Sequence, residues 1–293
     1  MPPGACRASP SPGCTIFPPL NLLESLSTLR PIGLEEVAGA ALLDRLDHKL
    51  IVSERWLPEV LAYCHATEGE KDGGYRILEV NGQRQSRYDN VFYDSPDFDA
   101  FNDHVRGRKV RHKARIRSYG SNGQTFVEIK RKTVHGRTVK DRIVRASDAA
   151  WDAPLTAQES EFMRQHFPYA DRSGAVMRSK FNRFTLVHSA RGERITVDTD
   201  LVYGRPEHAI DDPEAAPLLR RVSGIAVLEI KQVRIDRQSP IYRIVDHFLG
   251  AHPPLGRPTR LSKFILGTGL MHPQLPLRTY LPVFRDIQRS LIP

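Results

Sequence analysis

The sequence predicts an α+β fold built on a closed antiparallel β-barrel of about eight strands, with a basic interior and helices packed outside. Residues 110–145 read as three consecutive strands joined by glycine-containing turns at 120–123 and 135–136. Each of these strands alternates charged with apolar residues, so one face of the sheet is basic and the other is apolar. Helices are expected between groups of strands, where they can cover the apolar face and leave the charged face turned inward.

The remaining elements follow from periodicity and turn signals. Strands are expected at 45–52, 75–80, 88–93, 181–188, 193–203 and 226–233, and helices near 54–66, 95–105, 154–165 and 239–249. The segment Ser262-Lys263-Phe264 reads as a short connection. Residues 1–30 are rich in Pro, Ser and Gly and are expected to be a disordered leader. Residues 31–275 should form one domain, followed by a tail at 276–293 that is expected to be helical.

Composition favours a polyanionic partner. Lys and Arg number 43 against 34 Asp and Glu, which gives a net charge of +9 and a pI near 9.6. The three cysteines, Cys6, Cys14 and Cys64, lack metal-ligand spacing, so we expect neither a zinc site nor disulfides, and a reducing, cytoplasmic location. No apolar run approaches the roughly 18 residues of a membrane span. Neither a Walker loop nor a GxGxxG motif is present.

The charged strand faces together carry a surplus of cations. Thirteen basic residues fall on them against five acids, a surplus of eight that nearly equals the net charge of the chain. The basic residues are Lys49, Arg111, Lys113, Arg115, Arg117, Lys130, Lys132, Lys140, Arg142, Arg183, Arg194, Lys231 and Lys263. The acids are Asp47, Glu128, Asp198, Asp200 and Glu229.

Two interpretations of this face compete. An ordinary solvated face is the simpler one, but such faces usually mix both charge signs because like charges opposite one another repel. An enclosed face without a counter-anion would cost several kcal/mol for each unpaired charge. A phosphate chain would supply the missing charge, with Arg making bidentate contacts and Lys acting as point charges. The acids could then hold a divalent ion that bridges phosphate oxygens.

Nine short segments stand out in collinear order: RLDHK at 45–49, YDNVFYDSPDFDAF at 88–101, RHKARIRSYG at 111–120, EIKRK at 128–132, VKDRI at 139–143, FNRFTL at 181–186, ERITVD at 193–198, LEIKQ at 228–232 and LSKFILG at 261–267. Together they resemble the VTC domain, the polyphosphate polymerase module of the vacuolar transporter chaperone complex, over roughly residues 31–272. This family belongs to the triphosphate tunnel metalloenzymes, which implies a closed barrel with a basic lumen. The implied reaction is transfer of the ATP γ-phosphate onto orthophosphate or a polyphosphate end.

The resemblance also implies roles for individual residues. Triphosphate or the growing chain would be bound by Lys49, Arg115, Arg117, Lys130, Lys140, Arg183, Arg194 and Lys263, with Ser262 assisting and Lys231 completing the catalytic candidates. Glu229, with Glu128, would hold Mn²⁺ or Mg²⁺. Asp47 stands where the superfamily usually carries glutamate and is one methylene shorter, so we expect it to support Lys49 rather than to bind metal.

Several alternatives stay open at this stage. Glu229 could pair with Lys231 or a facing arginine, Asp198 could be a structural partner of Arg194, and Arg111 and Lys113 could lie at the tunnel mouth. A tunnel triphosphatase would share the lumen and differ only in using water as the acceptor. A non-catalytic polyanion-binding module is the alternative from another class. Few aromatic residues flank the basic strands, so we expect no nucleic acid partner. Export of the product would need a separate membrane partner.

Overall fold

The computed structural model describes residues 21–39, 46–66, 73–145, 150–233, 236–251 and 262–290. Residues 1–20 of the expected leader, Arg45 of the first charged strand and Leu261 lie outside these ranges. Within the described residues, no helix is both long enough and apolar enough to span a membrane.

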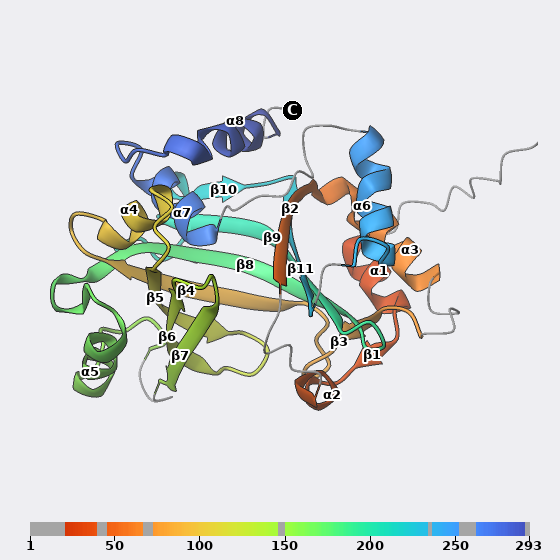
Figure 1. The fold of residues 1–293 in the computed structure, drawn as a ribbon, viewed down its shortest axis with the longest axis horizontal. Helices are drawn as coiled ribbons and strands as arrows, with labels where there is room; N and C mark the ends of the chain where they lie inside the picture. Colours follow the sequence, from red (N-terminus) through yellow and green to blue (C-terminus); the bar gives the residue numbers. More distant parts are fainter. Residues whose placement is uncertain are drawn as a thin grey trace, which may run out of the picture.

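One large sheet of eleven strands organises the fold (Figure 1). Its main path runs β2-β11-β9-β8-β4-β5-β6-β7, and every neighbouring pair on that path is antiparallel. The strands are β1 (Pro31–Ile32), β2 (Leu46–Ser53), β3 (Arg76–Leu78), β4 (Ser86–Asp94), β5 (Arg111–Tyr119), β6 (Thr125–Lys132), β7 (Thr138–Val144), β8 (Gly174–His188), β9 (Glu193–Gly204), β10 (Arg220–Val222) and β11 (Ile225–Gln232). The short strands β1, β3 and β10 lie off this path, where β3 pairs with β1 and β8 and β10 pairs with β9, and they carry no predicted site residue.

The closed barrel that we predicted is not confirmed. In the described part of the chain, β2 and β7 end the pairing path, and no backbone hydrogen bonds join them. Alternation in the sequence fixes which face of each strand is charged. Whether the first and last strands meet depends on twist and stagger, which alternation does not specify. The sheet is therefore large and antiparallel, as expected, but open between β2 and β7.

Eight α-helices lie around this sheet in the described residues, with α1, α3 and α6 gathered on one side (Figure 1). They are α1 (Leu22–Thr28), α2 (Leu34–Gly39), α3 (Leu57–Ala66), α4 (Asp99–Val105), α5 (Ala157–His166), α6 (Pro240–Ala251), α7 (Lys263–Met271) and α8 (Leu281–Ser290). Single turns of 3₁₀ helix occur at Glu54–Trp56, Ala170–Arg172, Ala216–Leu218 and Arg278–Tyr280.

Two of these helices correct our expectations. Helix α1 falls inside the leader that we expected to be disordered; Asn21 and Glu24 form a reciprocal cap at its start, and its Leu26 is buried. Helix α7 replaces the short connection expected at Ser262–Phe264. Its two glycines hid it from sequence reasoning, because glycine lowers helix propensity. They are tolerated because an added Cβ at Gly267 would overlap the Tyr203 ring, and one at Gly269 would lie 2.8 Å from Phe284 Cζ.

The apolar strand faces are covered by helices, as the sequence indicated. Residues of β2, β8, β9 and β11, such as Leu50, Leu186, Ile195 and Leu228, pack in one cluster with residues of α1, α3 and α6. Elsewhere α5 packs against β6 and β7. These helices pack on the apolar face of the sheet and do not cover its charged face.

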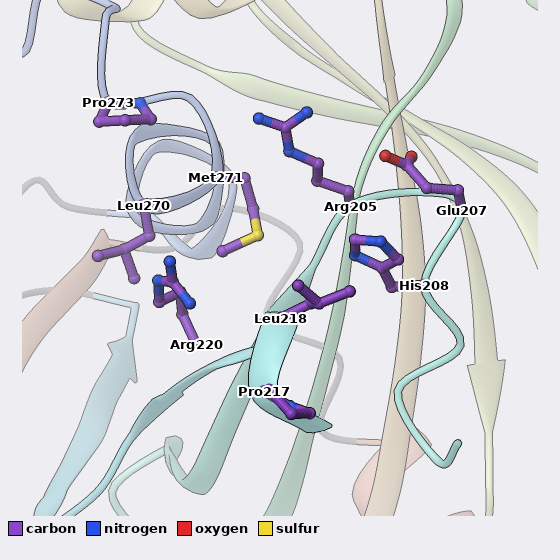
Figure 2. Close-up of a pocket in the computed structure, with 9 residues that line it drawn as sticks. All are labelled: Arg205, Glu207, His208, Pro217, Leu218, Arg220, Leu270, Met271 and Pro273. Carbon is purple, nitrogen blue, oxygen red and sulfur yellow. The ribbon is translucent and has the colours of Figure 1, made fainter. Parts of the chain in front are cut away.

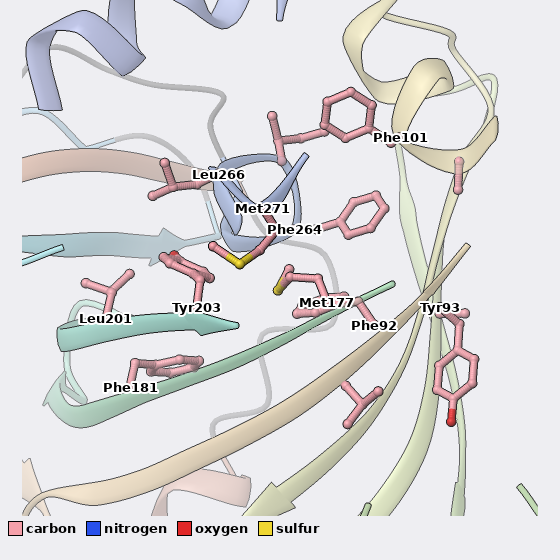
Figure 3. Packing of buried hydrophobic residues seen from close by; sticks show 14 of the residues in the cluster. Phe92, Tyr93, Phe101, Met177, Phe181, Leu201, Tyr203, Phe264, Leu266 and Met271 are labelled. Carbon is pink, nitrogen blue, oxygen red and sulfur yellow. The ribbon is translucent and has the colours of Figure 1, made fainter. Parts of the chain in front are cut away.

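Helix α7 lies against part of that charged face. The Phe92 and Phe264 rings are 5.4 Å apart, and Phe92 shares a face with Arg115, its partner in the β4–β5 register. Figure 3 shows Phe264 and Met271 of α7 above Met177 and Tyr203 of β8 and β9. An apolar cluster therefore occupies one part of the face, and the charged cluster lies beside it.

Candidate active site

Strand register brings the predicted basic residues together on one face, which we call the inner face. The side chains of two residues that lie opposite one another in neighbouring antiparallel strands point to the same side of the sheet. From β5 to β7 the pairs are Arg111–Lys132, Lys113–Lys130, Arg115–Glu128, Lys130–Lys140 and Glu128–Arg142. Lys113, Lys130 and Lys140 therefore stand in one row across three strands, an arrangement that mutual repulsion disfavours without an anion.

The other half of the inner face is built on β2, β11, β9 and β8. Here the pairs are Asp47–Lys231, Lys49–Glu229, Lys231–Arg194, Glu229–Thr196 and Asp198–Arg183. The apolar residues Leu228 and Ile230 alternate with Glu229 and Lys231 and are buried on the opposite face. The predicted alternation is confirmed on both halves.

The two halves face one another although they lie far apart along the sheet. Burial, together with the nearby charges of Lys49 and Arg111, lowers the pKa of Lys113 to about 7. Burial also holds the pKa of Lys130 well below its usual range, with Arg115 adding to the effect. The Glu229 carboxylate acts on both of these lysines. Such interactions between β5 or β6 and β2 or β11 require the sheet to curl around its inner face.

Two glutamates each form ion pairs with two cations. Glu128, fully buried, accepts Arg115 Nη2 at 2.6 Å, pairs with Lys140 and accepts the Tyr119 hydroxyl at 3.3 Å. Burial opposes ionisation of Glu128, but Arg115, Arg117 and Lys140 hold its pKa well below the usual range.

Glu229 occupies the equivalent place on the other half. Lys49 Nζ lies 2.5 Å and Lys231 Nζ 2.7 Å from its two oxygens. Burial opposes ionisation here as well, yet Lys231 and Lys49 hold the pKa of Glu229 well below the usual range. The pairing with Lys231 that the sequence left open is present, and Lys49 is a second partner.

Asp198 corrects a predicted pairing. Its carboxylate accepts Arg183 Nε at 2.5 Å and Arg183 Nη2 at 2.7 Å, and it also pairs with Lys263, whereas we expected Arg194. Arg194 lies four residues earlier on the same strand, beyond reach, while Arg183 is the cross-strand partner. Burial raises the pKa of Asp198, but Arg183 and Lys263 outweigh that effect and bring it to about 2.

Ser262 and Lys263 reach the site through α7. The Ser262 hydroxyl caps the helix by accepting the Ile265 N–H at 3.3 Å, and Lys263 is the first helical residue. Lys263 Nζ also lies 4.3 Å from the centre of the Phe181 ring. The observed work of Ser262 is therefore to fix the start of α7, which positions Lys263.

Lys113, Lys130 and Arg117 are among the inner-face cations that have no carboxylate partner in the described residues. No hydrogen bond or ion pair of Lys113 or Lys130 occurs in the described ranges, although both side chains are half-buried. Arg117 donates its Nε–H to Asn90 Oδ1 at 2.8 Å and lies 5.2 Å from the Tyr88 ring centre. Burial lowers the pKa of Arg117 to about 10. Lys113, Lys130 and Arg117, which are shielded from solvent and lack a carboxylate partner, form a candidate anion-binding site.

The donor set bears on the expected metal ion. No group of three or more His, Cys, Asp or Glu in the described part of the chain is placed to hold a metal. Glu128, Asp198 and Glu229 lie on separate strands, and each is already bound by two cations. Such a face fits a divalent ion only together with phosphate, because Mg²⁺ commonly takes one or two carboxylates and completes its shell with phosphate oxygens and water.

Some residues differ from expectation or were missed. Asp200 has a φ of 52°, lies at a register shift, is exposed and bonds Asn182, so it leaves the inner face although alternation placed it there. Asn90, which fixes Arg117, and Thr196, which accepts Lys231 Nζ at 3.2 Å, were not predicted. Their positions alternate in phase with the charged residues, and that phase was the available signal.

The depressed pKa of Lys113 predicts that tripolyphosphate binds more weakly as the pH rises from about 7 to about 9. Below about pH 7, Lys113 is already protonated in the free protein, so binding costs no proton. Above that, a bound anion must draw a proton onto the lysine, and affinity should fall by up to about tenfold per pH unit for each such group. Lys231 and Lys263, whose pKa values burial lowers to about 8, should add to the fall.

Titration calorimetry in two buffers of different ionisation enthalpy would measure the affinity and the proton uptake together. Lys113→Met should flatten the profile between about pH 7 and 8. A tripolyphosphate affinity that stays constant from about pH 7 to 9 would contradict the assignment of Lys113 to the anion-binding site.

Comparison with solved structures gives remote similarities. A protein from Pyrococcus horikoshii has 13% sequence identity and a TM-score of 0.41, with 75% of this chain and 94% of that chain covered. A putative adenylate cyclase from Bacillus halodurans has 10% identity and a TM-score of 0.44, with 75% and 96% covered. A Hippeastrum protein described as a putative adenylyl cyclase with dominant triphosphatase activity has 11% identity and a TM-score of 0.38, with 80% and 97% covered. The comparison with curated proteins gave no match.

The family comparison covers most of the sequence. The family model described as the VTC domain matches residues 45–272, a range that begins just before β2 and ends just after α7. That range contains every predicted site residue and the whole main path of the sheet. This chain belongs to the VTC domain family.

Proposed function

We propose that this protein is a metal-dependent polyphosphate polymerase, which transfers the γ-phosphate of ATP onto orthophosphate or the end of a polyphosphate chain. Membership of the VTC domain family supports a phosphoryl-transfer enzyme. The observation that carries the proposal is the set of half-buried and buried cations without carboxylate partners, Lys113, Lys130 and Arg117, among the described residues. A triphosphate would supply the negatively charged partner that these three cations lack.

The arrangement suits phosphoryl transfer because that reaction asks for positioning and charge neutralisation. In the transfer, the bond from the γ-phosphorus to the bridging oxygen breaks, and its electron pair leaves on ADP. A terminal oxygen of the acceptor phosphate forms the new bond to the γ-phosphorus. Arg115, Arg117 and Lys130 would bind donor oxygens, while Lys49, Lys231 and Lys263 on the facing half would orient the acceptor.

A divalent ion would enter with the nucleotide. Glu229 would be its protein ligand, with Glu128 as the second predicted ligand, and Mn²⁺ or Mg²⁺ would neutralise charge between the β- and γ-phosphates. Lys49 and Lys231 hold the Glu229 carboxylate ionised, which is the form that binds a cation.

One end of the sheet supports a long chain as the product. The end is formed by the loop after α4, the start of β5, the end of β6 and the turn before β7, which register and sequence place together. Its basic residues are Arg106, Arg108, Lys109, Arg111, Arg131, Lys132 and Arg137. Asp103 lies 3.9 Å from Arg108 there. This basic end adjoins the Lys113–Lys130 pair, so it could hold phosphates beyond the reacting ones.

Incubation of the purified protein with ATP and Mn²⁺ should release ADP and produce a ladder of polyphosphate on a gel. The double substitution Arg108→Gln with Lys109→Gln should shorten the ladder, because it removes two positive charges from the basic end. Both residues are exposed, so they can be changed without disturbing the core. The matched control, Arg164→Gln with Arg172→Gln, changes exposed arginines elsewhere and should leave the ladder unchanged.

Other outcomes would point to the alternatives. Orthophosphate released in place of a ladder would identify a tunnel triphosphatase, in which water replaces phosphate as the acceptor. Tripolyphosphate binding without any turnover would identify a polyanion-binding module. Either result would reject the polymerase.

A further inference from the structure

A cavity lies away from the charged inner-face cluster. It has a volume of about 490 Å³, within the range of small-molecule sites. Figure 2 shows Arg205 and His208, from the segment after β9, on one side and Leu270 and Met271, from the end of α7, on the other. None of its lining residues belongs to the site described above.

The polar part of this cavity is basic. Arg205 makes no side-chain hydrogen bond or ion pair in the described ranges, and Arg220 donates only to the Leu219 carbonyl oxygen, at 3.2 Å. Glu207 is the acid that lines the cavity, so Arg205, Arg220 and Glu207 together give the lining a net charge of +1. The Nδ1 atom of His208 is buried without a hydrogen-bond partner, which is costly unless a ligand or water satisfies it. These groups favour an anion.

The rest of the lining is apolar. Leu218 is 52% exposed at the cavity, and Leu270 and Met271 form the opposite wall. A polyphosphate has no apolar surface to place against such a wall. The combination instead fits a ligand with one acidic group and a hydrocarbon body.

Helix α7 connects this cavity to the inner face. Lys263 and Met271 are its first and last residues, which places their Cα atoms about 12 Å apart along the axis at 1.5 Å per residue. An added Cβ at Gly267 would overlap the Tyr203 ring, and one at Gly269 would lie 2.8 Å from Phe284 Cζ. Close packing on both sides leaves the helix little room to adjust internally, so a ligand against Met271 should shift it as a unit. Lys263, which pairs with Asp198, would shift with it.

We propose that the cavity binds a small organic anion with an apolar body, a carboxylate or a phosphate monoester, and that α7 transmits this binding to Lys263. The first part is independent of the reaction. The second part rests on the proposed function, because it concerns phosphate binding on the inner face.

Titration calorimetry with decanoate and with decyl phosphate tests the first part, with decan-1-ol as the uncharged control. One anion or both should bind at one site per chain, and the stronger of the two identifies the acidic group. Decan-1-ol should bind at least about tenfold more weakly, because it cannot form the charge-assisted bonds. Arg205→Gln with Arg220→Gln, and separately Leu218→Asp, should weaken binding by about tenfold or more. These residues are exposed, so the variants should fold.

The control pair Arg164→Gln with Arg172→Gln should leave the affinity for the anions unchanged. Absence of binding by both anions, or binding that is indifferent to the Arg205, Arg220 and Leu218 substitutions, would overturn the proposal.

The second part is tested by measuring tripolyphosphate affinity with and without a saturating concentration of the stronger anion. A change of at least about threefold is expected, and tripolyphosphate should change the anion's affinity by the same factor. Lys263→Met should remove this coupling while leaving anion binding intact. Unchanged tripolyphosphate affinity would overturn the coupling alone. If tripolyphosphate does not bind at all, the proposed function fails, whereas the cavity proposal still stands on the anion titrations.

Discussion

Replacing both Lys113 and Lys130 with methionine should abolish tight tripolyphosphate binding and, at the same time, make the protein more stable. Each lysine would contribute a charge-assisted contact of about 1.5–3 kcal/mol, so losing two should weaken binding roughly 100-fold or more. In the free protein the same charges are partly desolvated, lie opposite one another and lack a carboxylate partner in the described ranges. Their removal should therefore raise the free energy of unfolding.

The two effects are measured separately, by calorimetric titration and by thermal unfolding without ligand. The unfolding midpoint should rise by roughly 2–4 °C for each kcal/mol gained in a chain of this size. Arg183→Met is the contrasting variant, because it leaves Asp198, which is 1% exposed, with Lys263 as its remaining cation. That variant should lose binding and also lose up to about 3–5 kcal/mol of stability. A destabilised Lys113→Met/Lys130→Met protein would show that these lysines are compensated in the free state.

Glu229→Gln should reduce metal-dependent turnover by about 100-fold or more while tripolyphosphate still binds. The substitution preserves the shape of the side chain but removes the charge that would ligate Mn²⁺. It also releases Lys49 and Lys231 from their shared carboxylate, so binding of the anion alone should be equal or tighter. ATP turnover at several Mn²⁺ concentrations, beside tripolyphosphate titration without metal, separates the two effects.

Asp47→Asn is the matched control for this variant. Asp47 neighbours Lys231 in the β2–β11 register but is exposed, and its substitution should cost far less turnover than Glu229→Gln. Full metal-dependent turnover in Glu229→Gln, with loss in Asp47→Asn, would move the metal site to the first strand and show our assignment to be wrong.

The inner face could be predicted because period-two alternation is a local property. Lys113, Arg115 and Arg117 share a side of β5 whatever the rest of the chain does, and the register then aligns them with Lys130 and Glu128. The family resemblance similarly rested on short segments, and the family model matches residues 45–272, the range in which they lie.

The parts that could not be predicted depend on contacts between distant segments. Asp198 pairs with Arg183 because β8 and β9 pair in one particular register, which alternation alone does not select. Helix α7 carries glycines that propensity counts against a helix, yet these glycines allow its close approach to β8 and to α8. Closure of the sheet, likewise, depends on accumulated twist across all its strands.

The close packing of α7 has a consequence for how this protein tolerates random mutation. Gly267 and Gly269 have no side chain with which to touch a substrate, yet a single added methyl group at either position would push against its neighbours. The helix would have to move, and Lys263 at its start would lose its alignment with Asp198. A genetic screen for inactive variants should therefore recover these glycines as readily as the charged residues they help to place.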